Sequence, residues 1–302
     1  MFASAHTPFN ADGRFNGSTV LRQYELFRDA GVNGVFVCGI EGEGHSLSVA
    51  ERRAVLETWV GVLEGELPLI AHVGHSSLRD AVRLAEHAGK AGATALAAMA
   101  PAYFPPATLE ELIEYLAAIA AAAPDLPFLF YDVPDRNGVC FPTEQVLEWG
   151  RLRIPNLAGV NLGSPDLKTF ARCQQLEGDF DVLAGNEESW LPSLALGARA
   201  AVGGTLGFAA PVYRRIEEAF VGGDIDRARA EHAKTLQLGR ALQEFGTVRA
   251  GKALASMLGV DCGVVRLPLR SLHDREFREL HGRLRGLDIF ARSLSPPAEL
   301  GR

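Results

Sequence analysis

Polar side chains gather near the predicted ends of strand-like segments, where they could carry out acid–base or metal chemistry. Seven such residues are His6, Glu41, His72, His75, Asp132, Asn161 and Asn186. A carboxylate with one or two histidines can bind a divalent metal that polarises a carbonyl group. We assign no metal site. If a metal does bind, the candidate ligands are Glu41, His72 and His6. The same groups could instead transfer protons near neutral pH, or His6 and His72 could be hydrogen-bonded core residues.

These residues need strands and helices to position them, and the chain alternates the two. Strand-like apolar runs occupy residues 2–6, 33–38, 68–73, 94–99, 127–132, 156–161, 180–185 and 199–204. Each gap between runs can hold one helix, and several of these helices begin with Ser, Thr or Asp, which cap helix N-termini. Eight strand-then-helix units predict an α/β fold, a closed (β/α)8 TIM barrel with its chemistry at the carboxyl ends of the strands. An open sheet would favour a glycine-rich phosphate turn after the first strand, and HTPFNADG is not one.

Helix-like sequence continues after the eighth unit, over residues 225–244, 247–258 and 275–285. No Ser/Gly-rich linker precedes it, so a second independently folding domain is not expected. We therefore assign residues 1–222 to the barrel and residues 223–302 to a C-terminal helical extension packed on the barrel.

Composition narrows the class of protein. With 302 residues and 47% hydrophobic residues, the chain can build a large core, and its net charge of -7 argues against a nucleic-acid-binding face. The four cysteines form no C-x-x-C pair and are expected to be reduced thiols. We see no signal peptide, no membrane span and no cofactor motif. These features predict a cytoplasmic protein that needs no cofactor.

Six motifs occur in register with the predicted strands. They are TPFNADG (7–13), GIEGEGHSLSVAER (39–52), PAYFPPA (101–107), YDVPDRNG (131–138), GVNLGS (159–164) and VRLPLRSL (265–272). In this order the set resembles the dihydrodipicolinate synthase and N-acetylneuraminate lyase family of class I aldolases. The resemblance covers nearly the whole chain. It implies a TIM barrel and a homotetramer built as a dimer of tight dimers.

The resemblance also implies roles for particular residues. The family condenses a lysine at the end of strand six with an α-keto acid, and a tyrosine at the end of strand five, here Tyr131, moves the proton. A second tyrosine, here Tyr103, reaches across the dimer interface, and an arginine, here Arg136, meets the second substrate. From their strand positions, Gly185, Val202 and His72 are expected to contribute to the ligand site.

The chain departs from the family pattern at two decisive places. Asn161 stands where the lysine is expected, and an amide nitrogen lacks the lone pair that an imine requires. Ile40 and Glu41 replace the two hydroxyl residues of the G-T-T-G-E loop that holds the keto-acid carboxylate. A carboxylate at position 41 would repel another carboxylate. Together these changes predict that Schiff-base aldolase activity is lost, and that Asn161, Ile40 and Glu41 belong to an altered pocket.

Three functions remain open at this stage. The protein could bind a small keto-acid or sugar-acid ligand without Schiff-base turnover. It could be a lyase or hydratase with altered chemistry, either acid–base or metal-assisted. It could also be a non-catalytic structural or regulatory partner of an active paralogue. The partners expected are a small organic acid or sugar acid and further copies of the same chain, with no nucleic acid and no membrane.

Overall fold

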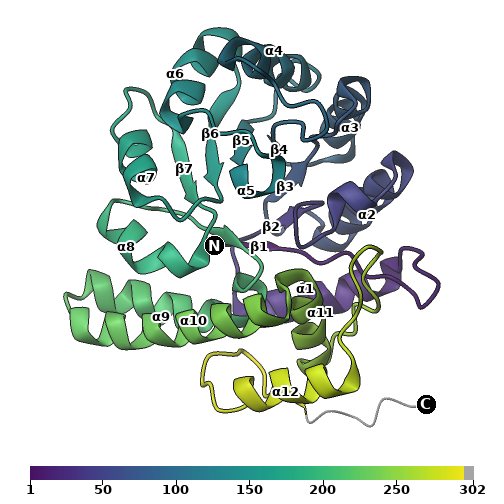
Figure 1. Ribbon diagram of the computed structural model, residues 1–302, viewed down its shortest axis with the longest axis vertical. Helices are drawn as coiled ribbons and strands as arrows, with labels where there is room; N and C mark the ends of the chain where they lie inside the picture. Colours follow the sequence, from purple (N-terminus) through teal and green to yellow (C-terminus); the bar gives the residue numbers. More distant parts are fainter. Residues whose placement is uncertain (296–302) are drawn as a thin grey trace.

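The computed structural model describes residues 1–295 and contains one eight-stranded parallel sheet. Its strands are β1 (Phe2–Ser4), β2 (Gly34–Val37), β3 (Leu69–His72), β4 (Ala95–Ala98), β5 (Phe128–Asp132), β6 (Leu157–Leu162), β7 (Asp181–Ala184) and β8 (Val202–Gly203). They pair in the order β7-β6-β5-β4-β3-β2-β1-β8 (Figure 1). A parallel bridge between Ala184 and Ala201 joins the two end strands. The predicted (β/α)8 barrel is confirmed.

Helices follow the strands as the sequence predicts. They are α1 (Val20–Ala30), α2 (Val49–Leu63), α3 (Leu78–Ala91), α4 (Leu109–Ala120), α5 (Pro134–Asn137), α6 (Thr143–Arg153), α7 (Leu167–Gln174), α8 (Trp190–Ala195), α9 (Leu206–Val221), α10 (Ile225–Phe245), α11 (Thr247–Met257) and α12 (Asp274–Leu284). Ser48 and Thr108 begin α2 and α4 with capping boxes, in which a side-chain oxygen accepts a helix N–H. The single-turn α5 was not predicted, because four residues carry no helical periodicity.

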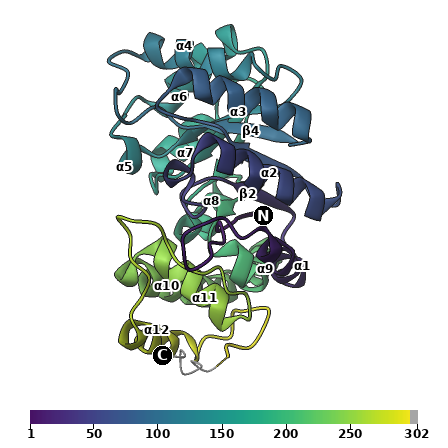
Figure 2. The ribbon, with the colours of Figure 1, turned by 90° about the vertical axis from the view of Figure 1, so that its right-hand side faces the viewer.

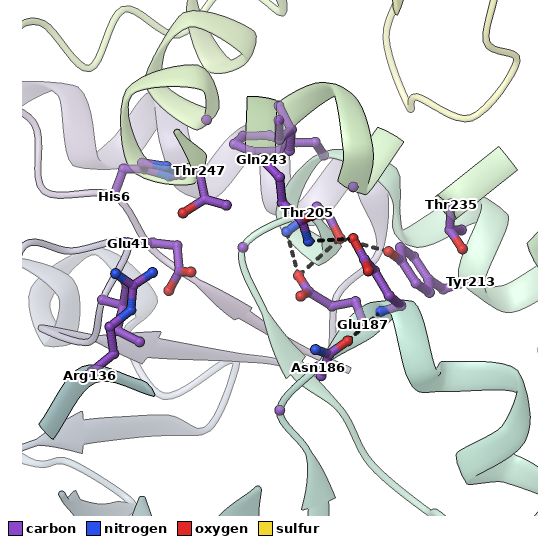
Figure 3. Close-up of a pocket in the computed structure, with 18 residues that line it drawn as sticks. His6, Glu41, Arg136, Asn186, Glu187, Thr205, Tyr213, Thr235, Gln243 and Thr247 are labelled. Carbon is purple, nitrogen blue, oxygen red and sulfur yellow. Dashed lines mark hydrogen bonds between the residues drawn. The ribbon is translucent and has the colours of Figure 1, made fainter. Parts of the chain in front are cut away.

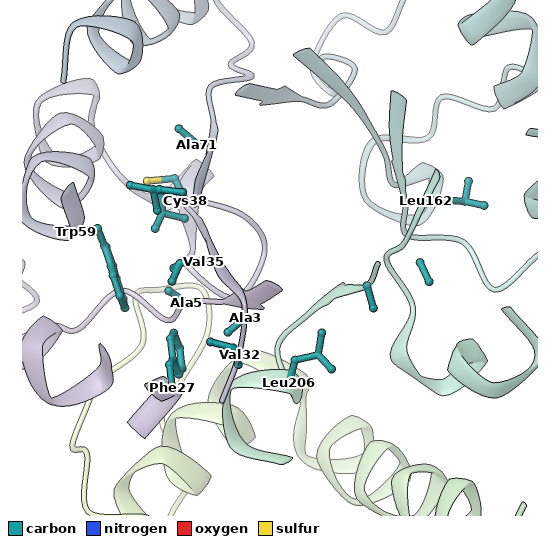
Figure 4. Packing of buried hydrophobic residues seen from close by; sticks show 14 of the residues in the cluster. Ala3, Ala5, Phe27, Val32, Val35, Cys38, Trp59, Ala71, Leu162 and Leu206 are labelled. Carbon is teal, nitrogen blue, oxygen red and sulfur yellow. The ribbon is translucent and has the colours of Figure 1, made fainter. Parts of the chain in front are cut away.

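Two faces of the strands pack in different ways. Phe36, Leu129, Tyr131 and Leu183 point into the barrel and form an interior cluster. The opposite face packs on the helices, where Phe27 of α1 and Trp59 of α2 stack with ring centroids 5.8 Å apart (Figure 4). Side chains alternate between the two faces of a sheet, and residues paired in register on neighbouring strands share a face. Tyr131 points into the barrel, so its partner on β6, Asn161, also lies inside the barrel.

The C-terminal helices α10, α11 and α12 gather at one end of the molecule (Figure 2). Helix α10 packs along α9, and α10 and α11 contribute residues to a cavity that the strand ends also line. The division between residues 222 and 223 stays a prediction, and residues 296–302 of the predicted extension lie outside the described part. No helix within residues 1–295 is both long enough and apolar enough to cross a membrane.

A buried ion pair fastens α11 to the loop that follows β2. Lys252 Nζ lies 2.7 Å from Glu43 Oε1, and both side chains are almost fully buried. Lys252 also donates to the Val264 carbonyl at 2.6 Å, and its ammonium lies 4.2 Å from the centre of the Phe9 ring. Glu43 itself has a left-handed backbone, with φ of 52°. Such a conformation is costly for a residue with a Cβ, so these contacts help to hold the loop in shape.

We expect Glu43→Gln to lower the free energy of unfolding by about 3 kcal/mol, because it leaves the buried Lys252 ammonium without its counter-charge. Urea unfolding followed by circular dichroism measures this value. Glu279→Gln removes a half-exposed partner of Arg283 and is the matched control, expected to cost less than about 1 kcal/mol. Equal losses in the two variants would contradict a structural role for the buried pair.

Candidate functional site at the carboxyl ends of the strands

Two neighbouring cavities open where the strands end, and they share the side chains of Ile40 and Arg136. The first has a volume of about 180 Å³ and lies between the ends of β1, β2, β7 and β8 and the helices α10 and α11. The second has a volume of about 340 Å³ and is lined mainly by apolar and aromatic groups, among them Tyr131 and His72. The site therefore has a polar half and an apolar half, with Arg136 of α5 at their junction.

Carboxylates dominate the first cavity. Glu41 and Glu187 extend toward the same space from opposite sides (Figure 3). Glu41 Oε2 accepts a hydrogen bond from Ser4 Oγ at 2.6 Å, and Glu187 Oε1 accepts from the Thr205 amide at 2.7 Å and from its hydroxyl at 3.0 Å. Burial, reinforced by the nearby Glu41 charge, raises the pKa of Glu187 to about 7. Glu187 can therefore exchange a proton near neutral pH.

Further polar groups complete the walls of this cavity. The Thr205 and Tyr213 hydroxyls lie 2.7 Å apart. From α10, Gln243 Nε2 donates to Glu188 Oε1 at 2.7 Å, and Thr247 stands at the start of α11. These hydroxyl and amide groups can donate or accept hydrogen bonds, so the cavity suits a ligand rich in polar groups.

His6 contributes a buried imidazole to the same cavity. Its side chain is 2% exposed, and its Nε2 atom has no hydrogen-bond partner within residues 1–295. Burial and the positive charge of Lys252 lower the pKa of His6 to about 3, so the ring is neutral at physiological pH. Gly251 of α11 lies against this nitrogen, and a side chain at position 251 would collide with it.

The second cavity is built from neutral aromatic groups. His72 Nδ1 lies 3.0 Å from the Cys38 carbonyl oxygen and 3.3 Å from an Arg52 guanidinium nitrogen. Burial and the buried Arg52 guanidinium hold the pKa of His72 well below its usual value. Tyr131 packs edge-on against His72 with centroids 5.6 Å apart, and burial raises the pKa of Tyr131 well above its usual value. Both side chains are therefore uncharged, and the Tyr131 hydroxyl keeps its proton.

Asn161 lies deeper in the barrel than either cavity. It is 1% exposed, pairs in register with Tyr131, and is not among the residues that line the two cavities. Its Oδ1 atom has no hydrogen-bond partner in the described chain and packs against Gly185, which does line the first cavity.

The structure brings some of the other sequence-predicted residues together and separates the rest. Ile40, Glu41, Arg136 and Gly185 line the first cavity, whereas Val202 packs inside the barrel. The exposed Tyr103 lies on the loop after β4, and its contact with a second copy of the chain stays a prediction.

The candidates for a metal site divide between the two cavities. His6 and Glu41 line the first, and His72 lines the second. In residues 1–295, no three His, Cys, Asp or Glu side chains are grouped so that they could hold one metal ion.

Sequence reasoning missed Glu187, Thr205, Gln243 and Thr247. Glu187 and Thr205 follow predicted strand ends, so a closer inspection of residues just past each strand could have found them. Gln243 and Thr247 carry no such signal, because they reach the cavity from helices that follow the barrel in sequence.

Comparison with known proteins identifies relatives over nearly the full length. Residues 1–286 match the Dihydrodipicolinate synthetase family. The chain is 35% identical over 281 residues to N-acetylneuraminate lyase of Gallus gallus, covering 89% of each chain. It is 35% identical over 299 residues to the Homo sapiens lyase, covering 96% of this chain and 93% of that one. The solved structure of Proteus mirabilis N-acetylneuraminate lyase matches with a TM-score of 0.92 and 35% identity, over 96% of this chain and 98% of that chain.

We expect Glu187→Gln to raise the thermal unfolding midpoint at pH 8 and to raise it less at pH 5. The pKa of Glu187 rises from 4.5 to about 7 on folding, so the folded state loses stability as pH increases through this interval. The full penalty above pH 7 is about 3 kcal/mol, and glutamine removes it while retaining an oxygen for Thr205. Differential scanning calorimetry at both pH values measures the effect. The exposed Glu86→Gln is the control, and an equal shift at both pH values would contradict the assignment.

Proposed function

We propose that this chain, which belongs to the dihydrodipicolinate synthetase family, binds a small keto-acid or sugar-acid ligand without forming a Schiff base. One observation carries the proposal: no lysine within the described residues lines either cavity. Lys90 and Lys168 are exposed on α3 and α7, Lys234 pairs with Glu231 on α10, and Lys252 is committed to Glu43. An imine needs a free amine beside the ligand carbonyl, and none is available here.

Two other groups supply the means to hold an acid. The Arg136 guanidinium lines both cavities and has no side-chain hydrogen bond or ion pair within residues 1–295, so its planar donors are open to a ligand carboxylate. The Tyr131 hydroxyl, which keeps its proton, can donate to a ligand oxygen in the second cavity. Glu41 opposes a carboxylate placed close to the loop after β2, so the Arg136 guanidinium has to supply the positive charge that holds the acid group.

The first test is reductive trapping. Incubation with pyruvate and sodium borohydride should leave the intact mass of the protein unchanged, because Asn161 offers no amine. Intact-protein mass spectrometry reads the result, and a lysine-linked pyruvate adduct would contradict the proposal.

Two variants sharpen the trapping experiment. Asn161→Lys alone should remain largely untrapped, since Ile40 and Glu41 still cannot hold the pyruvate carboxylate. The triple variant Ile40→Thr, Glu41→Thr, Asn161→Lys restores the amine and the hydroxyl pair together and serves as the positive control. Efficient trapping by Asn161→Lys alone would show that the loop after β2 does not oppose the carboxylate.

A second candidate function is a lyase or hydratase that works by acid–base chemistry. It is supported by Glu187, whose pKa of about 7 and position opposite Glu41 suit a group that both accepts and donates protons. We expect loss of water or carbon–carbon cleavage in at least one member of a panel of 2-keto sugar acids, followed by mass spectrometry. Glu187→Gln should slow that reaction about a hundredfold, whereas Glu86→Gln should not. A wild-type protein that is inert toward the whole panel would eliminate this candidate.

A further inference from the structure

The first cavity contains more negative than positive groups. Three carboxylates line it, from Glu41, Glu187 and Glu188, against a single cation, Arg136. His6 adds no charge, because burial keeps its ring neutral. No Lys or Arg nitrogen within residues 1–295 lies in ion-pair distance of Glu41 or Glu187. All three carboxylates are half-buried. Partly desolvated carboxylates without a counter-ion are destabilising, so their presence in a cavity points to a partner supplied from outside the chain.

The hydrogen bonds inside the protein leave one oxygen open on each of these two carboxylates. Ser4 occupies Oε2 of Glu41, and Thr205 occupies Oε1 of Glu187. Oε1 of Glu41 and Oε2 of Glu187 accept no hydrogen bond in the described structure. An ionised carboxylate oxygen only accepts, so the open atom of Glu187 requires a donor once this residue has lost the proton that it exchanges near pH 7, and the open atom of Glu41 accepts in the same way. The two side chains approach the cavity from opposite sides, which places two acceptors around one space (Figure 3).

Two further buried polar atoms have no partner, one on a residue that lines this cavity and one on a residue packed against its lining. His6 Nε2 belongs to a residue that lines the cavity and is 2% exposed. Asn161 Oδ1 packs against the cavity-lining Gly185 and belongs to a residue that is 1% exposed. Buried polar atoms almost always have a hydrogen-bond partner in folded proteins, so unpaired atoms beside an open cavity indicate a ligand or ordered water. This indication is independent of the carboxylates, because it comes from the segment after β1 and from β6.

The missing partner must therefore donate hydrogen bonds and carry positive charge. A hydroxyl group donates one hydrogen bond and leaves the carboxylate charge in the cavity uncompensated. A primary ammonium group donates three hydrogen bonds and neutralises charge at the same time. The unpaired Arg136 guanidinium, which lies on the same side of the cavity as Glu41 (Figure 3), accommodates an anion.

We infer that the first cavity binds a small zwitterion, in which a primary ammonium group lies between Glu41 and Glu187 and a carboxylate contacts Arg136. The inference rests on the proposed acid-binding function and narrows it to amino acids with a short polyhydroxylated carbon skeleton. The hydroxyl groups of such a skeleton meet Thr205, Gln243 and Thr247. Glu41 then has a function of its own, because it gives the loop after β2 a group that binds an amine in place of the hydroxyl groups that are expected to bind a carboxylate.

A matched pair of probes tests the inference. D-glucosaminate and D-gluconate differ only in an amine or a hydroxyl group at carbon 2. Isothermal titration calorimetry at pH 7 should give a dissociation constant about tenfold to a hundredfold lower for glucosaminate, the range typical of hydrogen bonds between charged groups. Glu41→Gln and Glu187→Gln should each reduce that preference at least about threefold. Glu86→Gln, which changes an exposed carboxylate on α3, should leave it unaltered.

The outcomes separate this inference from the proposed function. Equal or tighter binding of gluconate would overturn the ammonium site while leaving the acid-binding function in place, and so would a preference that both glutamine variants retain. Binding of neither acid would also overturn the ammonium site. Stabilisation by Mg²⁺ or Ca²⁺ that exceeds the effect of glucosaminate, and that both variants abolish, would assign the carboxylates to a metal instead. A pyruvate adduct trapped by borohydride would reject the proposed function itself.

Discussion

The ion pair between Lys252 and Glu43 is the contact on which the site depends. Its lysine comes from α11 and its glutamate from the loop after β2. The pair therefore joins two elements that both contribute residues to the lining of the first cavity. The Phe9 ring reinforces this junction, because the Lys252 ammonium and the Arg266 guanidinium lie 4.2 and 4.3 Å from its centre. Glu41 lies two residues before Glu43, and its position follows from that of the fastened loop. Because the Lys252 amine is held in this ion pair, it is not free to form an imine with a ligand.

Electrostatics divides the site into two different environments. Around the second cavity, the buried Arg52 donates to the carbonyl groups of His72 and Gly74 rather than to a carboxylate. Burial, reinforced by the Arg52 charge, lowers the pKa of the neighbouring His72 and His45 and keeps both rings neutral. Around the first cavity, Glu187 holds its proton more tightly because it is desolvated by burial and because Glu41 is near, both of which raise its pKa. One half of the site therefore presents neutral rings and the other presents acceptors, and Arg136 stands where they meet. A ligand that spans both would need an anionic group at that junction.

Strand and helix positions followed from the sequence because their signals are local. All eight predicted strands and the helices after them are present, since apolar runs and Ser or Thr caps act over a few residues. The short α5 escaped prediction, although it carries Arg136. Gly185 was expected at the site and does line the first cavity, whereas Val202, one strand along, turns into the barrel interior. Successive side chains of a strand point to opposite faces, so a shift of one residue decides which side chain faces the cavity. The sequence does not specify that shift at a strand of only two residues.

The sequence by itself determined the barrel, the family and the absence of a lysine at position 161, because each is a matter of residue type and order. Only the tertiary structure decided where Asn161 lies relative to the cavities, which carboxylates face each other, and that α10 and α11 cover the site. Each of these features depends on residues that are far apart in the sequence but close in space, such as His6 with Gly251 and Glu41 with Glu187. Burial and pairing depend on what packs around a group in space, so the charges of a site emerge only when the chain is folded.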